Sequence, residues 1–159
     1  MSVTAPSQIV ATHRGEGRLI RFFADEFEVK SQRDGRDVVD ITANAGCEPP
    51  MHVHDHEDES FIVLEGAVTF FAGDEVIDAG PGTHVYAPRG IAHTYAVRSG
   101  VARMIVTASP SGFVEMLDAV NEEFGGTMPA APAPEHFPLL GATLARFGIT
   151  IVGPNPGAA

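Results

Sequence analysis

The sequence is poor in cysteine and in cationic residues. Its 159 residues include one cysteine, Cys47, which cannot form a disulfide within the chain, so we expect a reducing, cytoplasmic environment. Only 10 residues are Lys or Arg, against 21 Asp or Glu, and the net charge is −11. Because a nucleic-acid backbone is bound by clustered cations, this charge argues against a DNA or RNA partner.

The chain also lacks a long apolar run, so no membrane partner is expected. Its first residues, MSVTAPSQIVATHRGEG, have neither the basic start nor the apolar stretch of a signal peptide. The apolar fraction of 44% and the charged fraction of 19% are typical of a folded globular domain.

Short apolar or alternating runs, separated by glycine-containing turns, fill the chain from about residue 18 to residue 108. A period of two is typical of strands. We predict strands at residues 18–23, 27–31, 37–43, 51–54, 60–64, 67–71, 75–79, 83–88, 93–97 and 101–108. Without any alternation of strands and helices, this pattern predicts an all-β sandwich or barrel.

After Pro110 the pattern becomes helical. Apolar residues recur on one face of residues 111–126, where Ser111 can cap the helix and two glycines end it. A Pro/Ala-rich linker precedes a second predicted helix at residues 139–148, and the tail ends in residues that cannot continue regular structure. We therefore divide the chain into an N-terminal arm (1–17), a barrel (18–110) and a C-terminal helical cap and tail (111–159).

The stretch MHVHDHEDESF, residues 51–61, contains candidate metal-binding residues. His52 and His54 are two apart on a predicted strand, so they project from the same face. A turn at residues 55–58 would bring the Glu59 carboxylate back to that side. The sequence thus permits these three side chains to bind one metal ion, with His56 on the turn as a candidate neighbour that supports them.

Glycines, a proline and a fourth histidine complete a larger pattern. One motif, G-x5-H-x-H-x4-E-x6-G, is met by Gly46, His52, His54, Glu59 and Gly66. A second, G-x5-P-x-G-x2-H-x3-N, is met by Gly82, Pro88, Gly90 and His93. In these motifs the sequence resembles the cupin superfamily over roughly residues 40–108, and it departs only where Val97 replaces Asn.

The resemblance implies a cupin double-stranded β-helix, or jelly-roll barrel, with C-terminal helices. It also implies one divalent transition metal held by His52, His54, Glu59 and His93. Nitrogen and oxygen ligands suit Fe, Ni, Mn, Co, Cu or Zn. Four protein ligands leave two positions open on an octahedral ion, which favours catalysis; the alternative is a cupin that kept these residues without a functional metal.

Strand parity gives a candidate substrate pocket. The residues expected to face inward beside the metal ligands are Phe61, Val63, Tyr95, Val97 and Met104. Such a pocket is apolar and partly aromatic, as small-molecule sites commonly are, and it lacks cations for a sugar phosphate. Each of these residues would also serve as ordinary core.

The C-terminal segments SPSGFVEML and ARFGITIVGPNP resemble the tail of quercetin 2,3-dioxygenase-like single-domain cupins. This resemblance implies a metal-dependent dioxygenase that cleaves a flavonol-like aromatic or enol substrate with O2, under C-terminal helices that cover the barrel mouth. Glu59 is the only carboxylate placed to take the substrate's hydroxyl proton, so we expect it to be both ligand and general base.

Cupin folds serve several functions, so two alternatives remain open. One is a metal-dependent polyketide cyclase or isomerase that uses no O2, and the other is a non-catalytic ligand-binding cupin. A homodimer is expected, because cupins commonly pair through sheet edges or exchanged strands and open edges need protection. The N-terminal arm could supply an exchanged segment.

Overall fold

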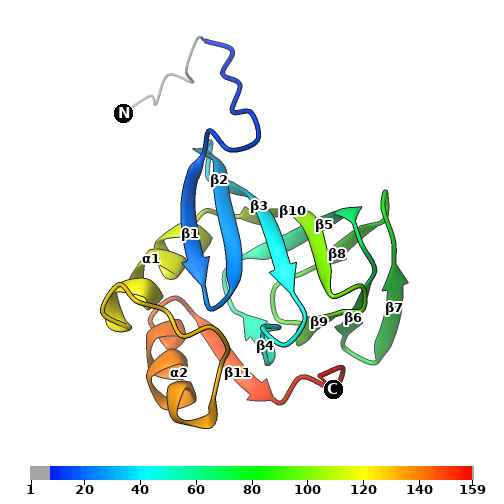
Figure 1. Cartoon of the computed structure of the whole chain (residues 1–159), viewed down its shortest axis with the longest axis vertical. Coiled ribbons are helices and arrows are strands. Elements are labelled where there is room, and N and C mark those ends of the chain that lie inside the picture. The colour runs from blue at the N-terminus through cyan, green and yellow to red at the C-terminus, as the bar shows by residue number, and fades with distance from the viewer. Residues whose placement is uncertain (1–7, 159) are drawn as a thin grey trace.

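The computed structural model describes residues 8–158, which fold into two antiparallel sheets with two helices beside them (Figure 1). In order across the first sheet, the strands are β1 (Arg18–Phe22), β2 (Asp25–Arg33), β3 (Arg36–Asn44), β10 (Val101–Ser109), β5 (Asp58–Glu65) and β8 (His84–Ala87). The second sheet contains β11 (Ile149–Gly153), β4 (Met51–His54), β9 (His93–Val97), β6 (Val68–Ala72) and β7 (Glu75–Ala79). This is the predicted all-β jelly roll. Part of the predicted N-terminal arm, residues 1–7, lies outside the described residues.

All ten predicted strands coincide with observed strands, but β11 was not predicted. It pairs antiparallel with β4, where Ile149 lies opposite His54 and Ile151 lies opposite His52. On its other side β4 pairs with β9 through His52 and His93. The tail therefore returns to the second sheet and flanks the strand that carries the first two histidines.

The core lies between the two sheets. Along β10, buried and less buried residues alternate, and Met104 and Val106 are fully buried on the inward face. Arg103 faces the other way and is held by Asp40, with Nη2 and Oδ2 2.6 Å apart. The parity inferred from the sequence, with Arg103 outward and Met104 inward, is confirmed.

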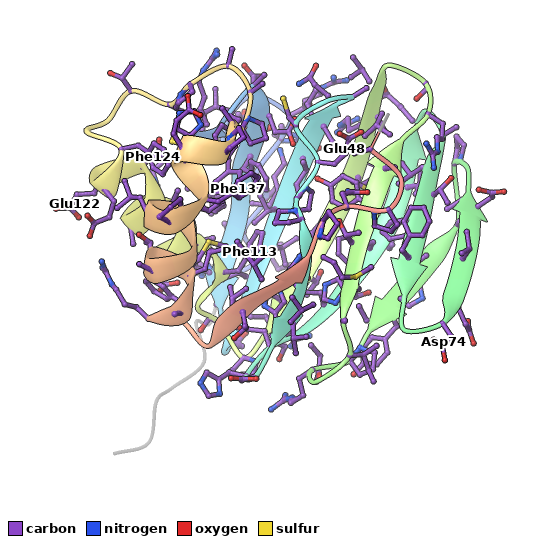
Figure 2. The ribbon with its side chains drawn as sticks, turned by 90° about the horizontal axis from the view of Figure 1, so that it is seen from below. Glu48, Asp74, Phe113, Glu122, Phe124 and Phe137 are labelled. Carbon is purple, nitrogen blue, oxygen red and sulfur yellow. The ribbon has the colours of Figure 1, made fainter. Side chains whose placement is uncertain are left out.

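Two α-helices follow β10, namely α1 (Phe113–Glu123) and α2 (Phe137–Ala145), with a short 3-10 turn at Pro134–His136 between them. Figure 2 shows α1 and α2 side by side at one flank of the barrel, where they contact each other, β1 and β11. Gly125 and Gly126 adopt positive φ angles directly after α1, as predicted for its end. No helix among residues 8–158 has the length and apolarity to cross a membrane.

The predicted cap of α1 was wrong. The helix begins after Gly112 with no capping side chain from Ser111. Instead, Oδ2 of Asp37, a fully buried residue of β3, accepts hydrogen bonds at 3.0 Å from the main-chain N–H groups of Gly112 and Val114. A residue distant in sequence thus satisfies the first N–H groups of the helix and fastens it to the barrel.

We expect Asp37→Ala to destabilise the protein by about 1–2 kcal/mol, because two N–H donors at the start of α1 lose their acceptor. Urea unfolding followed by circular dichroism would measure this change. Asp37→Asn, which keeps an acceptor oxygen, should recover part of the loss, and Asp74→Ala in an exposed turn serves as control. Equal stability of Asp37→Ala and wild type would contradict the capping role.

Candidate metal centre

Four side chains converge inside the barrel, from two paired strands of the second sheet and one strand of the first. His52 and His54 come from β4, Glu59 from β5 and His93 from β9. Their ligand atoms all lie within 4.8 Å of one another. The short turn between β4 and β5 brings Glu59 to the same side as the histidines, as the sequence predicted. These residues could hold a metal ion.

Hydrogen bonds fix which nitrogen of each imidazole faces the centre. His52 and His93 each donate from Nδ1 to the main-chain carbonyl oxygen two residues earlier, at 2.8 and 3.0 Å. Nδ1 of His54 lies 3.1 Å from Oε2 of Glu57. Since carbonyl and carboxylate oxygens accept, the proton is placed on Nδ1 and the Nε2 lone pair is available as a metal ligand.

The atoms at the centre all carry lone pairs. Oε2 of Glu59 lies 2.8 Å from Nε2 of His93 and 3.3 Å from Nε2 of His54. With Nδ1 already protonated, such approaches require a proton or a cation between the atoms. Three imidazole nitrogens and one carboxylate, with no thiolate, form a donor set suited to divalent transition metals. The geometry and the donor chemistry both fit a metal ion.

Burial and charge set the protonation of these groups. Burial opposes the charge of Glu59, but His54, His93 and His52 outweigh it and lower the pKa of this carboxyl to about 2. Burial lowers the pKa of His52 to about 4. Burial likewise opposes the charge of His54, yet Glu59 and Glu57 raise its pKa above the ordinary 6.5. At neutral pH the cluster thus contains an ionised Glu59 and a neutral His52.

His56 was the candidate neighbour that the sequence offered for support of the ligands, but Glu57 contacts a ligand instead. His56 is exposed on the turn, with its ring against Gly148, whereas Glu57 is buried and contacts His54. Glu57 was overlooked because it stands within the acidic run DHEDE, which is typical of a solvated turn. Its spacing of three residues from His54 across a turn is the feature that could have identified it.

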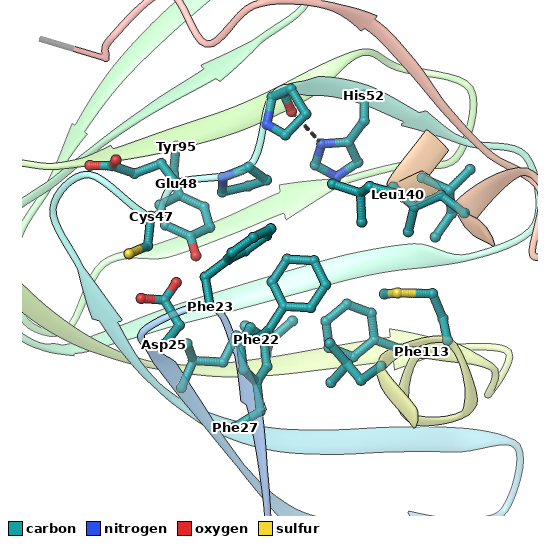
Figure 3. Close-up of a pocket in the computed structure, with 18 of the residues that line it drawn as sticks. Phe22, Phe23, Asp25, Phe27, Cys47, Glu48, His52, Tyr95, Phe113 and Leu140 are labelled. Atoms are coloured by element: carbon teal, nitrogen blue, oxygen red, sulfur yellow. Dashed lines mark hydrogen bonds between the residues drawn. The ribbon is translucent and has the colours of Figure 1, made fainter. Parts of the chain in front are cut away.

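An apolar cavity of about 90 Å³ adjoins the cluster (Figure 3). All four candidate ligands line it, together with six phenylalanines: Phe22, Phe23, Phe27, Phe61, Phe113 and Phe137. Met116, Leu117, Leu140 and Leu144 add walls from α1 and α2. The C-terminal helices therefore form one side of the cavity.

The cavity occupies less of the barrel than strand parity predicts. Phe61 and Tyr95 line it, but Val63, Val97 and Met104 do not. Val63 and Val97 are the next inward residues along β5 and β9, and Met104 lies two residues before the cavity-lining Val106 on β10. All three are buried in the core with 6% exposure or less. Packed rings close the cavity before it reaches them: Phe70 lies 5.1 Å from Phe61 and 6.0 Å from Tyr95 between ring centroids.

The two sheets form a jelly roll of the cupin type, with this cluster inside one end. Residues 39–108, which are less than half of the chain, match the family model described as the cupin domain. The matched range includes all four candidate ligands.

Three known proteins illustrate the likeness. Quercetin 2,3-dioxygenase of Bacillus subtilis (strain 168) is 22% identical over 104 residues, which are 65% of this chain but only 31% of that protein. The structure of KdgF from Halomonas sp. has a TM-score of 0.61 at 17% identity and covers 67% of this chain and 99% of its own. The polyketide cyclase RemF from Streptomyces resistomycificus has a TM-score of 0.56 at 20% identity, over 65% of this chain and 81% of its own.

We expect Glu57→Ala to weaken metal binding about 10–100-fold, because His54 loses the acceptor that orients its ring. Titration of metal-stripped protein with Zn(II) or Co(II) would measure the dissociation constant. Asp55→Ala, on the same turn but exposed, is the matched control and should bind as wild type. His52→Ala, which removes a ligand, should lose stoichiometric binding altogether. Wild-type affinity in Glu57→Ala would refute the supporting role.

Proposed function

We propose that this protein is a metal-dependent dioxygenase that cleaves a flavonol-like aromatic or enol substrate with O2. The observation that carries this proposal is the convergence of three Nε2 atoms and Glu59 on the wall of a cavity built from aromatic rings. The likeness to a quercetin 2,3-dioxygenase supports it. No Lys or Arg of the described residues lines the cavity, so a phosphorylated substrate would find no cationic partner there.

The metal would be held by His52, His54, Glu59 and His93, and when bound it would supply Lewis-acid activation of a substrate hydroxyl. Glu59 is the carboxylate at this end of the cavity, and we propose that it accepts the proton of the substrate hydroxyl. A carboxylate whose pKa is about 2 is a weak base. Proton transfer to Glu59 therefore depends on a hydroxyl made acidic at the same centre.

The apolar walls orient the substrate and exclude water. A flat ring is held by the surrounding phenylalanines through offset or edge-to-face contacts. The cavity, at about 90 Å³, is smaller than the roughly 150 Å³ that suffices for one benzene ring. A three-ring flavonol thus needs a wider cavity, and we propose that α1 and α2 move outward to admit it, as a lid does.

A second candidate is a polyketide cyclase or isomerase that works without O2. The fold shared with RemF and the presence of Glu59 beside an apolar cavity favour it. It would use the same proton acceptor and the same metal. Oxygen consumption separates the two reactions.

The decisive assay is oxygen uptake with quercetin and with smaller enols, using metal-stripped protein reloaded separately with Fe(II), Mn, Co, Ni, Cu or Zn. We expect metal-dependent uptake matched by loss of substrate. Substrate loss that continues without oxygen would favour the cyclase or isomerase, and binding without turnover by any loaded form would indicate a non-catalytic cupin.

Glu59→Gln should lower the rate of turnover by about 10²–10⁴-fold, because an amide cannot accept the hydroxyl proton. Metal content must be measured in parallel, and rates compared per bound metal. Glu75→Gln, on the exposed strand β7, is the matched control. Turnover per metal equal to that of wild type would show that Glu59 does not accept the proton.

A further inference from the structure

The cavity has a second polar end that the candidate metal centre does not use. Asp25 begins β2, is only 2% exposed and lines the cavity. Its Oδ1 accepts a hydrogen bond from the main-chain N–H of Asn44 at 2.7 Å and a longer one from the Asn44 amide at 3.4 Å. Both of these hydrogen bonds are made by Oδ1, and Oδ2 makes none to any described residue. One oxygen thus anchors the side chain and the other is free.

Tyr95 contributes a second free group at the same place. Its side chain is 6% exposed and lines the cavity, and its hydroxyl makes no hydrogen bond to residues 8–158. Figure 3 shows this hydroxyl and the Asp25 carboxyl turned toward each other, on the other side of Phe23 from His52. Buried tyrosine hydroxyls normally find a partner, so two unpaired polar groups facing one apolar cavity indicate a ligand.

Aromatic rings separate this polar end from the candidate metal ligands. Between ring centroids, Phe61 lies 6.4 Å from His93 and 6.5 Å from Tyr95. A ligand that reaches both ends must therefore have a flat apolar body with a polar group at each end.

The charge at this end of the cavity determines which polar group of a ligand can bind there. Asp25 and Glu48 line the cavity here, and no Lys or Arg of the described residues does. Burial, with a smaller contribution from Glu48, raises the pKa of Asp25 to about 7. A carboxylate or phosphate on the ligand would meet like charge and no cation. A hydroxyl, by contrast, can donate to Asp25 while it accepts from Tyr95.

We propose that Asp25 and Tyr95 bind a hydroxyl group at the end of the substrate remote from the metal, and that they reject a carboxylate there. The substrate class is then a neutral aromatic or enol with a second hydroxyl opposite its reacting oxygen. This inference rests on the proposed function, because it takes the reacting end to face His52, His54, Glu59 and His93.

The test measures binding without turnover. Zn(II)-loaded protein is titrated without oxygen, by calorimetry, with three α-hydroxyketone probes of increasing length: tropolone, 3-hydroxychromone and 3-hydroxyflavone. Each probe is used in three forms, namely unsubstituted, with a hydroxyl, or with a carboxylate. The added group stands at the end remote from the chelating oxygens. For at least one length, we expect the hydroxyl to tighten binding tenfold or more and the carboxylate to weaken it.

Two variants separate recognition from structure. Asp25→Asn keeps an acceptor for Asn44, and Tyr95→Phe keeps the ring. In each variant, the affinity of the hydroxyl probe relative to the unsubstituted probe should fall to about one. Asp25→Asn should also bind the carboxylate probe more tightly than wild type, an inversion that general loosening of the fold would not produce. Asp74→Asn and Tyr86→Phe, both at exposed positions, are the controls.

The outcomes distinguish the two proposals. If unsubstituted probes bind but no hydroxyl improves binding at any length, the inference fails and the proposed function stands. The same holds if the variants weaken all probes equally. If no probe of any length binds the loaded protein, the proposed function fails and this inference fails with it.

Discussion

Each histidine of the candidate centre donates its Nδ1 proton to an oxygen that the fold places beside it, and the site depends on these three hydrogen bonds. They fix the ring orientation and leave three Nε2 lone pairs directed at one point. Without them, each imidazole could rotate or present its other nitrogen. Two of the acceptors are main-chain carbonyls just before β4 and β9, so the path of the chain into each strand also orients its histidine.

The rest of the fold keeps those strands in place and isolates the centre. The strand β4 has only four residues and pairs with β9 at one register position, so the unpredicted β11 supplies most of its ladder. The helices α1 and α2 then cover the side of the cavity that the sheets leave uncovered. Asp37 connects this cover to the barrel, because the oxygen that caps α1 belongs to β3. The C-terminal segment thus contributes both to the barrel and to the wall of the cavity.

Local patterns in the sequence predicted the strands β1 to β10, the two helices and the grouping of His52, His54 and Glu59, because each depends on short spacings that the chain itself sets. His93 joined this group only through the resemblance to the cupin motifs, and β11 was not predicted. Contacts between distant segments could not be predicted in this way. The capping of α1 by Asp37 joins residues about 75 positions apart, and Asp25 enters the cavity from a strand that carries no motif. Met104 points inward as predicted but lies beyond the packed rings. Strand parity predicts which sheet face a side chain occupies, and it does not predict how far the cavity extends along the strand. The contact between Glu57 and His54 was not predicted, because Glu57 stands in an acidic run and the sequence does not specify the geometry of that turn.

The most direct test of the central claim is anomalous diffraction from crystals of the metal-loaded protein, with data collected at the absorption edge of the metal. We expect one ion about 2.0–2.3 Å from Nε2 of each of His52, His54 and His93, with a Glu59 oxygen completing the protein ligands. We also expect the three Nδ1 hydrogen bonds to persist. An ion bound through Nδ1, bound elsewhere, or absent after loading would contradict the account.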